Sequence, residues 1–434
     1  MRTLVGVAIF FAVLGVADCA HAIELKFPPP DFQTSYVLPD IYVPEPNSTT
    51  VGFGWWDSVI LFGALSLATF FVFKARSRRG LFLLSIFSLG FFGFYRNGCI
   101  CPVGSTQNVM AAVFIPDVGV SAIVVSFFVL PLLFSLFFGR VFCASVCPLG
   151  AIQELVAVAP IRISPSLERV LGLGKYLYLG LATLGVATGA GFLVCRYDPF
   201  VGIYRMGHSY NMLLAGAAIL ILGVFIARPY CRFMCPYGVL LGWMSYFSKF
   251  HLDIPPSPCV SCRLCEDSCP YNAIDMPTPP QLVEKPEVGK RRIRLTLLAS
   301  PALILAGAFV GYLMHEPLSR MHPTVSLSEQ IAKEDAGLVA AGVENLASDT
   351  FRTSNVTTEE LHADALAVKD TFKTGGAWLG AFMMLIVCLK LVQLSIVKKR
   401  DIFTPHKETC FSCGRCYPYC PVEEEEQELG TAAA

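Results

Sequence analysis

Seven apolar segments, each near the length that a helix needs to cross a bilayer, constrain this chain of 434 residues more than any other feature. A transmembrane helix needs about 20 predominantly apolar residues to span the hydrocarbon layer. The chain is 54% hydrophobic and only 15% charged, whereas about 25% of the residues in a soluble domain are charged. The sequence therefore predicts a mostly α-helical, polytopic membrane protein. The segments lie at 56–73, 80–95, 118–138, 175–194, 212–227, 295–314 and 376–397.

Lysine and arginine in the short loops predict the orientation, because cytoplasmic loops carry an excess of both. Basic clusters occur at 74–79, 290–294 and 398–400, and all three fall on one side if all seven segments span. We therefore expect a multi-pass protein of the cell inner (cytoplasmic) membrane with an exported N-terminus and a cytoplasmic C-terminus. The 33 basic and 33 acidic residues cancel, so nucleic acid is not expected as a partner.

Residues 1–22 have the pattern of a secretory signal peptide. An apolar stretch from Leu4 to Val16 follows Arg2, and Ala20-His21-Ala22 fits a small-residue cleavage site. An uncleaved anchor helix is the alternative, but the apolar stretch is short for a span. Residues 23–55 are then expected to form an exported N-terminal segment.

The strongest chemical signal is a cysteine spacing that occurs twice, each time with a proline after the fourth cysteine. This is the bacterial ferredoxin spacing, in which three thiolates bind one [4Fe-4S] cluster and the fourth binds the other cluster. Structural zinc is the alternative, and the regular triple followed by Cys-Pro fits it poorly. The sequence therefore predicts two [4Fe-4S] clusters. We expect one to be held by Cys259, Cys262, Cys265 and Cys420, and the other by Cys410, Cys413, Cys416 and Cys269.

The two cysteine motifs lie far apart in the chain, so the ferredoxin-like domain is split. Its first half is expected at 251–289 and its second at 401–422, followed by an acidic tail at 423–434. Between the halves we expect a transmembrane helix at 290–314, an exported loop at 315–375 and another transmembrane helix at 376–400. Ala/Leu spacing in the loop predicts short helices around 336–347 and 359–372. The loop is either a docking surface or a solvated connector.

A second cysteine motif occurs twice within a predicted membrane domain at 56–250. Cys143-x3-Cys147-Pro148 is matched 88 residues later by Cys231-x3-Cys235-Pro236. The flanking segments also match, which predicts an internal two-fold repeat of spans two and three in spans four and five. Four such thiols suit iron-sulfur or copper(I), and we hypothesise a shared metal or redox site. Structural packing of helix ends, or a thiol redox pair, is the alternative.

Several other residues bear on cofactors and partners. Cys99, Cys101 and Cys195 fall on the exported side, where they predict either a disulfide or a redox relay. Cys388 lies alone in the last span and is interpreted as a small apolar residue. No Cys-x2-Cys-His motif and no interior span histidine occurs, so haem is not expected. Arg205, His208 and Tyr210 could contact a quinone head group, although interfacial anchoring is typical of such residues.

The duplicated Cys-x3-Cys-Pro motif and the split ferredoxin resemble the NosR/NapH-type membrane iron-sulfur proteins, over roughly residues 50 to 422. The resemblance implies an electron-transfer component, rather than a stand-alone catalyst, that links quinone or cytoplasmic donors to exported respiratory or metalloenzyme systems. Its implied partners are membrane lipid and redox proteins on either side. Only about thirty residues separate the signal peptide from the first span, so the NosR flavin domain and covalent flavin are not expected. The similar CcoG-like proteins imply the alternative, copper handling for an exported metalloenzyme.

Overall fold

Helices make up most of the protein, as the sequence predicts. The computed structural model describes residues 48–98, 101–115, 118–158, 160–205, 210–254, 259–278, 286–338, 346–354, 356–396 and 399–421. The signal-peptide prediction therefore lies outside the described residues, as do Cys99, His208 and the acidic tail. Within the described ranges the only sheet is one antiparallel pair, β1 (Ile274–Asp275) with β2 (Thr404–Pro405).

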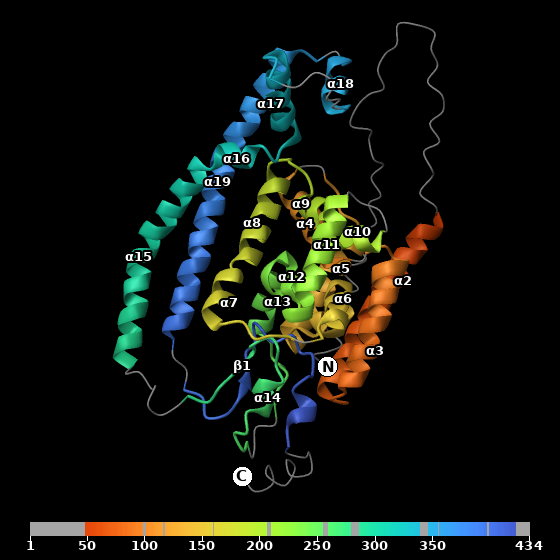
Figure 1. Cartoon of the computed structure of the whole chain (residues 1–434), viewed down its shortest axis with the longest axis vertical. Helices are drawn as coiled ribbons and strands as arrows, with labels where there is room; N and C mark the ends of the chain where they lie inside the picture. The colour runs from red at the N-terminus through yellow and green to blue at the C-terminus, as the bar shows by residue number, and fades with distance from the viewer. Residues whose placement is uncertain are drawn as a thin grey trace.

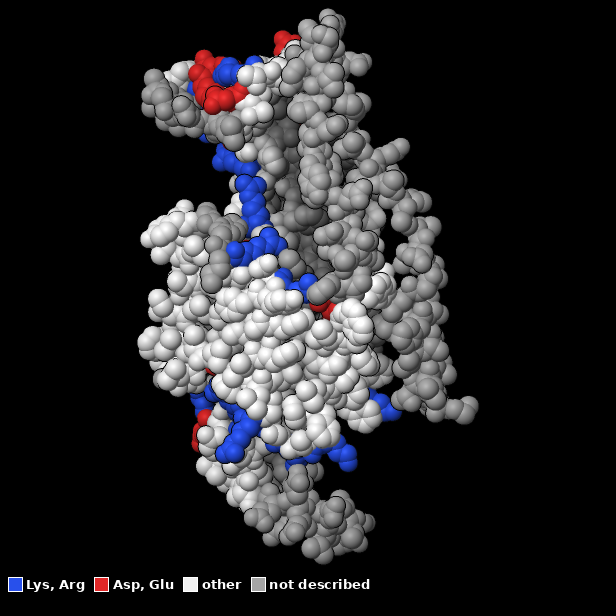
Figure 2. Space-filling model, turned by 90° about the vertical axis from the view of Figure 1, so that its right-hand side faces the viewer, with Lys and Arg blue, Asp and Glu red and all other residues white. Residues whose placement is uncertain are grey.

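Every predicted apolar segment contains helix. Four helical stretches are long and apolar enough to cross a membrane, namely Gly54–Phe73, Pro165–Ala187, Glu287–Leu313 and Thr358–Ser395. The space-filling view agrees, because a broad middle zone of the visible face carries no charged side chains (Figure 2). The helices over the predicted spans are α2 (Ser48–Phe73), α3 (Arg78–Ser88) continuing as the π-helix η1 (Leu89–Tyr95), α5 (Ala122–Phe138), α8 (Gly174–Ala187), α11 (Tyr210–Phe225), α15 (Pro286–Leu313) and α19 (Thr358–Ser395).

The bundle from α2 to α13 surrounds the largest apolar core. The helices α4 (Pro102–Phe114), α5 and α13 (Pro236–Tyr246) pack against one another, and α8 packs on α4 and α13. The core contains aliphatic and aromatic side chains together with the buried cysteines Cys143, Cys147 and Cys231. Helix α5 is apolar on all sides, as expected for a helix that faces both protein and lipid. The cysteines of the second motif are therefore interior residues of the bundle.

Helices α15 and α19 form a long antiparallel hairpin beside the bundle (Figure 1). Gly307 and Gly311 of α15 face Gly376 and Gly380 of α19 so closely that a Cβ atom on Gly311 would collide with the carbonyl of Gly376. Small residues at this spacing let helix backbones approach within a membrane. The hairpin rests on the bundle through α19, which packs against α8.

The predicted exported loop is helical, with one difference from the expectation. It contains α16 (His315–Ser319), α17 (Pro323–Asp335) and α18 (Leu346–Arg352), and the predicted helix at 359–372 is the first part of α19. The helix predicted at 336–347 is wrong at its start, because residues 336–338 follow the end of α17. Helix α17 begins at Pro323, and Gly337, with φ of +66°, ends it just after Asp335. Residues 339–345 lie outside the described part.

The two predicted ferredoxin halves meet at the other end of the molecule (Figure 1). The first contains α14 (Leu264–Asp267) and β1, and the second contains β2 and the 3-10 helix η4 (Tyr417–Tyr419). The pairing of Ile274 with Pro405 joins them directly. The hairpin α15–α19 therefore carries the chain away from the first half and back to the second.

Candidate iron-sulfur sites

Both Cys-x3-Cys-Pro motifs have the same local structure. The first cysteine lies in a short helix, Cys143 in the π-helix η2 (Phe142–Val146) and Cys231 in α12 (Pro229–Phe233). The second cysteine is extended and precedes a helix, Cys147 before α6 (Pro148–Val156) and Cys235 before α13. The prolines occupy the first helical position, where the missing N–H costs nothing. Each motif thus turns two thiols toward the same side of a helix start.

These four cysteines line one small enclosed cavity in the bundle. Val103, Phe142, Tyr237 and Leu241 contribute apolar walls to this cavity. Cys143, Cys147 and Cys231 are buried, and Cys235 is half-buried. The structure therefore brings together the four thiols that the duplicated motif led us to group.

Hydrogen-bond donors point at three of these sulfur atoms. Gln153 Nε2 donates to Cys231 Sγ at 3.3 Å, the Gly238 backbone N–H donates to Cys235 Sγ at 3.3 Å, and Arg140 Nη2 lies 3.8 Å from Cys143 Sγ. Burial raises the pKa of Cys231 to about 11, although Arg228 opposes this. A thiol must lose its proton to bind a metal, so metal binding at this site would release protons. The donors then stabilise the thiolate form.

A cluster and a single metal ion require different spacings of their ligand sulfur atoms. Among the described residues, no three His, Cys, Asp or Glu side chains are grouped closely enough for one metal ion. A cubane places each thiolate on a different iron, so its ligand sulfurs stand farther apart than those around one ion.

The two ferredoxin loops share an unusual backbone conformation. Ser261 and Ser412, each two residues after the first cysteine of its motif, have φ of +53° and +51°. Arg263 and Gly414, each directly after the second cysteine, have φ of +65° and +67°. Left-handed residues in such turns direct successive backbone N–H groups inward and form anion-binding concavities. Both loops therefore have the shape of a cradle for an anionic cluster.

The sulfur atoms of the ferredoxin halves form two neighbouring groups. Burial raises the pKa of Cys416 far above its ordinary value, and Cys413, Cys410 and Cys269 raise it further because they lie nearby. Burial also raises the pKa of Cys265, with Cys262 and Cys259 as neighbours. Cys259 and Cys420 pack in the same apolar cluster as Cys265. Cys416 packs there too, so it lies between the two groups. Ligation itself stays a prediction.

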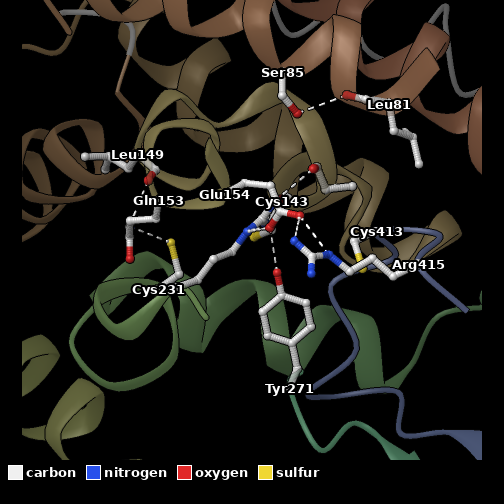
Figure 3. Close-up of polar contacts among 12 residues, drawn as sticks. Leu81, Ser85, Cys143, Leu149, Gln153, Glu154, Cys231, Tyr271, Cys413 and Arg415 are labelled. Atoms are coloured by element: carbon white, nitrogen blue, oxygen red, sulfur yellow. Dashed lines mark hydrogen bonds and ion pairs between the residues drawn. The ribbon is translucent and has the colours of Figure 1, made fainter. Parts of the chain in front are cut away.

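A buried carboxylate joins the bundle to both ferredoxin halves. Glu154 of α6 accepts hydrogen bonds from Arg228 Nε at 3.0 Å, from Arg415 Nη2 at 2.6 Å and from the Tyr271 hydroxyl at 2.7 Å, and it also pairs with Arg78 (Figure 3). Burial alone would raise the pKa of Glu154, but the three arginines outweigh it and lower the pKa well below the ordinary value. The carboxylate is therefore charged at neutral pH.

An aromatic pair lies between the bundle cysteines and the second ferredoxin half. Phe411 directly follows Cys410, packs in the core that contains Cys143, and stands 4.9 Å from the Tyr271 ring. The guanidinium of Arg140 lies 4.5 Å from the Phe411 ring on one side, and that of Arg228 lies 5.7 Å from it. The two groups of thiols are thus in one continuous packed region.

Sequence reasoning missed Arg140, Arg228, Glu154 and Tyr271. One signal was available, because Arg140 and Arg228 stand at the same position, three residues before the first cysteine of each copy. Nothing in the sequence indicated that Glu154 would pair with Arg228 and Arg415, which lie 74 and 261 residues away.

The remaining predicted residues lie elsewhere. Cys101 precedes α4, and Cys195 lies in α9 (Leu193–Tyr197), with its sulfur 3.5 Å from the position of a Cβ atom on Gly104. No disulfide joins Cys101 to Cys195 in this structure. Cys388 is buried in α19. Tyr210 is exposed at the start of α11, and a quinone contact by Arg205, His208 and Tyr210 stays a prediction.

Comparison with known families agrees with this geometry. Residues 120–165 and 209–255 both match the family Fer4_5, described as a 4Fe-4S binding domain, and each match contains one Cys-x3-Cys-Pro motif. Residues 252–275 match the family Fer4, which has the same description and covers the first ferredoxin half. The chain therefore combines segments that match 4Fe-4S binding domains with helices that are long and apolar enough to cross a membrane.

Several curated proteins are similar to part of this chain. Protein NirI of Paracoccus denitrificans is 33% identical over 32% of this chain and 22% of its own length. YccM of Escherichia coli, whose name describes it as a proposed electron transport protein, is 27% identical over 36% of this chain and 48% of its length. The regulatory protein NosR of Stutzerimonas stutzeri is 28% identical over 32% of this chain and 21% of its length. The chain is thus a distant homologue of these proteins over about a third of its own length.

The similarity covers only part of each relative. The chain spans less than half the length of these three proteins. No solved structure matches the chain.

Proposed function

We propose that this protein relays electrons between a cytoplasmic or quinone-pool donor and an exported redox system through three [4Fe-4S] clusters. One observation carries the proposal: the four bundle cysteines line one cavity, and that cavity is in the same packed core as Cys269, Cys410 and Cys413 of the ferredoxin halves. A ferredoxin alone transfers electrons between soluble partners. Thiols inside an apolar bundle, in contact with that ferredoxin, are what a path into the membrane requires.

The proposed ligands follow from the geometry and the spacing. Two clusters are assigned to the ferredoxin halves, with Cys269 and Cys420 each completing the site of the other half. The third is assigned to Cys143, Cys147, Cys231 and Cys235, each motif of which lies in a segment that matches a 4Fe-4S binding domain. A bound [4Fe-4S] cluster accepts and returns one electron at a time. The protein orients the thiolates, excludes water from the bundle site and supplies N–H donors to sulfur.

The bundle site addresses a physical problem of distance. An electron cannot cross roughly 30 Å of hydrocarbon efficiently in one step, so a relay needs a centre beyond the soluble ferredoxin. Cys101 packs against the same core as Cys143 and Cys147, and Tyr204 connects the two regions by donating its hydroxyl to the Pro148 carbonyl at 2.9 Å. We assign the exported end of the path to Cys101 and Cys195, with Cys99 two residues before Cys101 in the sequence.

The proposal includes an orientation and an internal repeat. All seven predicted segments are proposed to span, which places the ferredoxin halves in the cytoplasm and α16–α18 outside. The shared local structure of the two Cys-x3-Cys-Pro motifs supports a same-direction two-fold repeat of the bundle. In that arrangement the clusters lie where thiols stay reduced.

The relay is tested directly in sealed vesicles that contain the purified protein. Dithionite outside is the electron donor, and ferricyanide trapped inside is the acceptor, since neither crosses the bilayer readily. We expect ferricyanide reduction to depend on the protein and to fall to the protein-free rate in the Cys143→Ser/Cys231→Ser variant. Equal rates with and without the protein would overturn the relay.

Copper handling, the alternative from the sequence, makes a different prediction for the same preparation. Copper(I) bound by the bundle cysteines would appear as about one copper per chain, retained after dialysis and lost in Cys143→Ser/Cys231→Ser. The relay predicts iron and sulfide in that site and no stoichiometric copper. Metal analysis of the anaerobically purified protein separates the two functions.

A further inference from the structure

Arg140 is a buried cation without a carboxylate partner. It is 3% exposed, and no ion pair joins it to a described acidic side chain, whereas the buried Arg228 and Arg232 pair with Glu154 and Glu168. Its Nη1 donates to the backbone carbonyl of Glu408 at 3.2 Å, and its Nε has no hydrogen-bond partner. The carboxylate of Glu408 is engaged by Lys390 instead.

An unpaired buried charge is costly, because water no longer solvates it. A folded protein keeps such a group when something else supplies the opposite charge. Among the described residues around Arg140, the groups that could supply this negative charge are cysteine thiols. Its Nη2 lies 3.8 Å from Cys143 Sγ in the bundle cavity, and its guanidinium lies 4.5 Å from the ring of Phe411, the residue after Cys410. Arg140 therefore stands between the bundle cysteines and the second ferredoxin half.

Resting on the proposed function, we propose that Arg140 is a shared counter-ion for two clusters, the one in the bundle site and the one held by Cys269, Cys410, Cys413 and Cys416. Four thiolates around a cubane give a net charge of about −2, which becomes about −3 on reduction. A cation fixed between two such centres stabilises the reduced form of each more than the oxidised form. Arg140 is thus a positioning residue that raises both reduction potentials and weakens the repulsion between the two centres.

Other residues near the clusters do not combine these properties. Arg228 is buried and also lies near Cys231 and Cys413, but it pairs with Glu154, whereas Arg140 pairs with no described carboxylate. Arg162 contacts the first ferredoxin half through the Glu266 carbonyl and Asp267, but its side chain is 40% exposed and solvent screens it. Arg162 therefore serves as a matched control, a cation beside a cluster motif but in water.

The test is an EPR-monitored redox titration of the full-length protein, purified anaerobically in detergent, after its iron content has been measured. Arg140→Gln removes the charge, Arg140→Lys keeps it, and Arg162→Gln is the control. We expect Arg140→Gln to shift two of the three centres to more negative potentials and to leave the centre of Cys259, Cys262 and Cys265 in place. Arg140→Lys and Arg162→Gln are expected to titrate like the wild type.

Two results would overturn the inference. One is a full iron content in Arg140→Gln with wild-type potentials, and the other is an equal shift in Arg140→Lys and Arg140→Gln, which would mean that shape rather than charge matters. If Arg140→Gln loses its iron, Arg140→Lys decides alone: wild-type potentials support the inference, and shifted ones overturn it. Failure of the proposed function looks different, because iron content is then unchanged by Cys143→Ser/Cys231→Ser.

Discussion

Two regions of the molecule are stabilised by opposite kinds of contact. One is the bundle with its docked ferredoxin halves, and the other is the hairpin α15–α19. At the base of the bundle, Glu154 gathers Arg78, Arg228, Arg415 and Tyr271 in a buried polar network. In the hairpin, Gly307 and Gly311 meet Gly376 and Gly380 backbone to backbone. Only 6% of the most apolar window of α15 is buried inside the protein. Buried charges therefore hold one region together, and close backbone contact between two largely exposed helices holds the other.

The difference assigns separate tasks to the two regions. The network around Glu154 fixes both ferredoxin halves against the bundle cysteines, so it sets the geometry between the proposed clusters. The hairpin returns the chain to the second half and carries α16–α18 at the opposite end (Figure 1). Damage to the network should therefore affect the clusters, whereas damage to the hairpin should mainly affect stability.

The largest expected difference is between the two sides of the membrane on which the hairpin tip and the ferredoxin halves are proposed to lie. Reporter fusions after residue 345, within the loop at the hairpin tip, should give high alkaline phosphatase activity, and fusions after residue 405, beside the ferredoxin halves, should give almost none. The effect is close to all-or-none, because the phosphatase folds only after export. The reverse pattern, or high activity at both sites, would contradict the proposed orientation.

Removing the charge of Glu154 from its buried network should have the largest effect on stability. Glu154→Gln leaves Arg228, whose side chain is 0% exposed, without its carboxylate, and loss of one partner from a buried ion pair costs about 3–5 kcal/mol. We expect the ferredoxin halves to loosen, with faster limited proteolysis within 401–421 and broadened cluster EPR signals. The control is Asp267→Asn, which removes the exposed pair with Arg162 and should cost at most about 1 kcal/mol. Equal effects in both variants would refute a special role for Glu154.

Low pH should weaken the same network by protonating Glu154. The folded-state pKa of Glu154 is lowered from its ordinary value of 4.5, so its contribution to stability is present above that value and is lost as the pH falls through the lowered pKa. The melting temperature of the detergent-solubilised protein should therefore fall more steeply below about pH 4.5 in the wild type than in Glu154→Gln. Parallel curves for the two proteins would show that another group controls the acid transition.

A smaller effect is expected in the hairpin. Gly311→Leu places a side chain against the carbonyl of Gly376, and overpacking of this kind costs typically about 1–3 kcal/mol. Thermal unfolding should occur at a lower temperature while the iron content stays at the wild-type level. Gly63→Ala is the matched control, because a Cβ atom there meets nothing within 4 Å. Loss of iron in Gly311→Leu would show that the two regions are not separable.

Much of this arrangement could be predicted from the sequence because it depends on local patterns. Each apolar segment contains helix, and the ferredoxin spacing marks the loops in which Ser261 and Ser412 take matching left-handed conformations. The prediction of a helix at 336–347 was wrong at its start. It followed the Ala/Leu spacing and overlooked the helix-start signal at Pro323 and the helix-stop signal at Gly337. The Glu154 network could not be predicted, because its partners come from distant segments and no local pattern encodes that pairing.

The central claim is that the bundle cysteines hold a third cluster, and iron and sulfide analysis tests it most directly. Three cubanes predict about twelve irons and about twelve acid-labile sulfides per chain. The Cys143→Ser/Cys231→Ser variant should retain about eight of each and lose one EPR species, because the ferredoxin cysteines are unchanged. A wild-type content of about eight that stays at eight in the variant would contradict the account and leave the bundle cysteines a structural role.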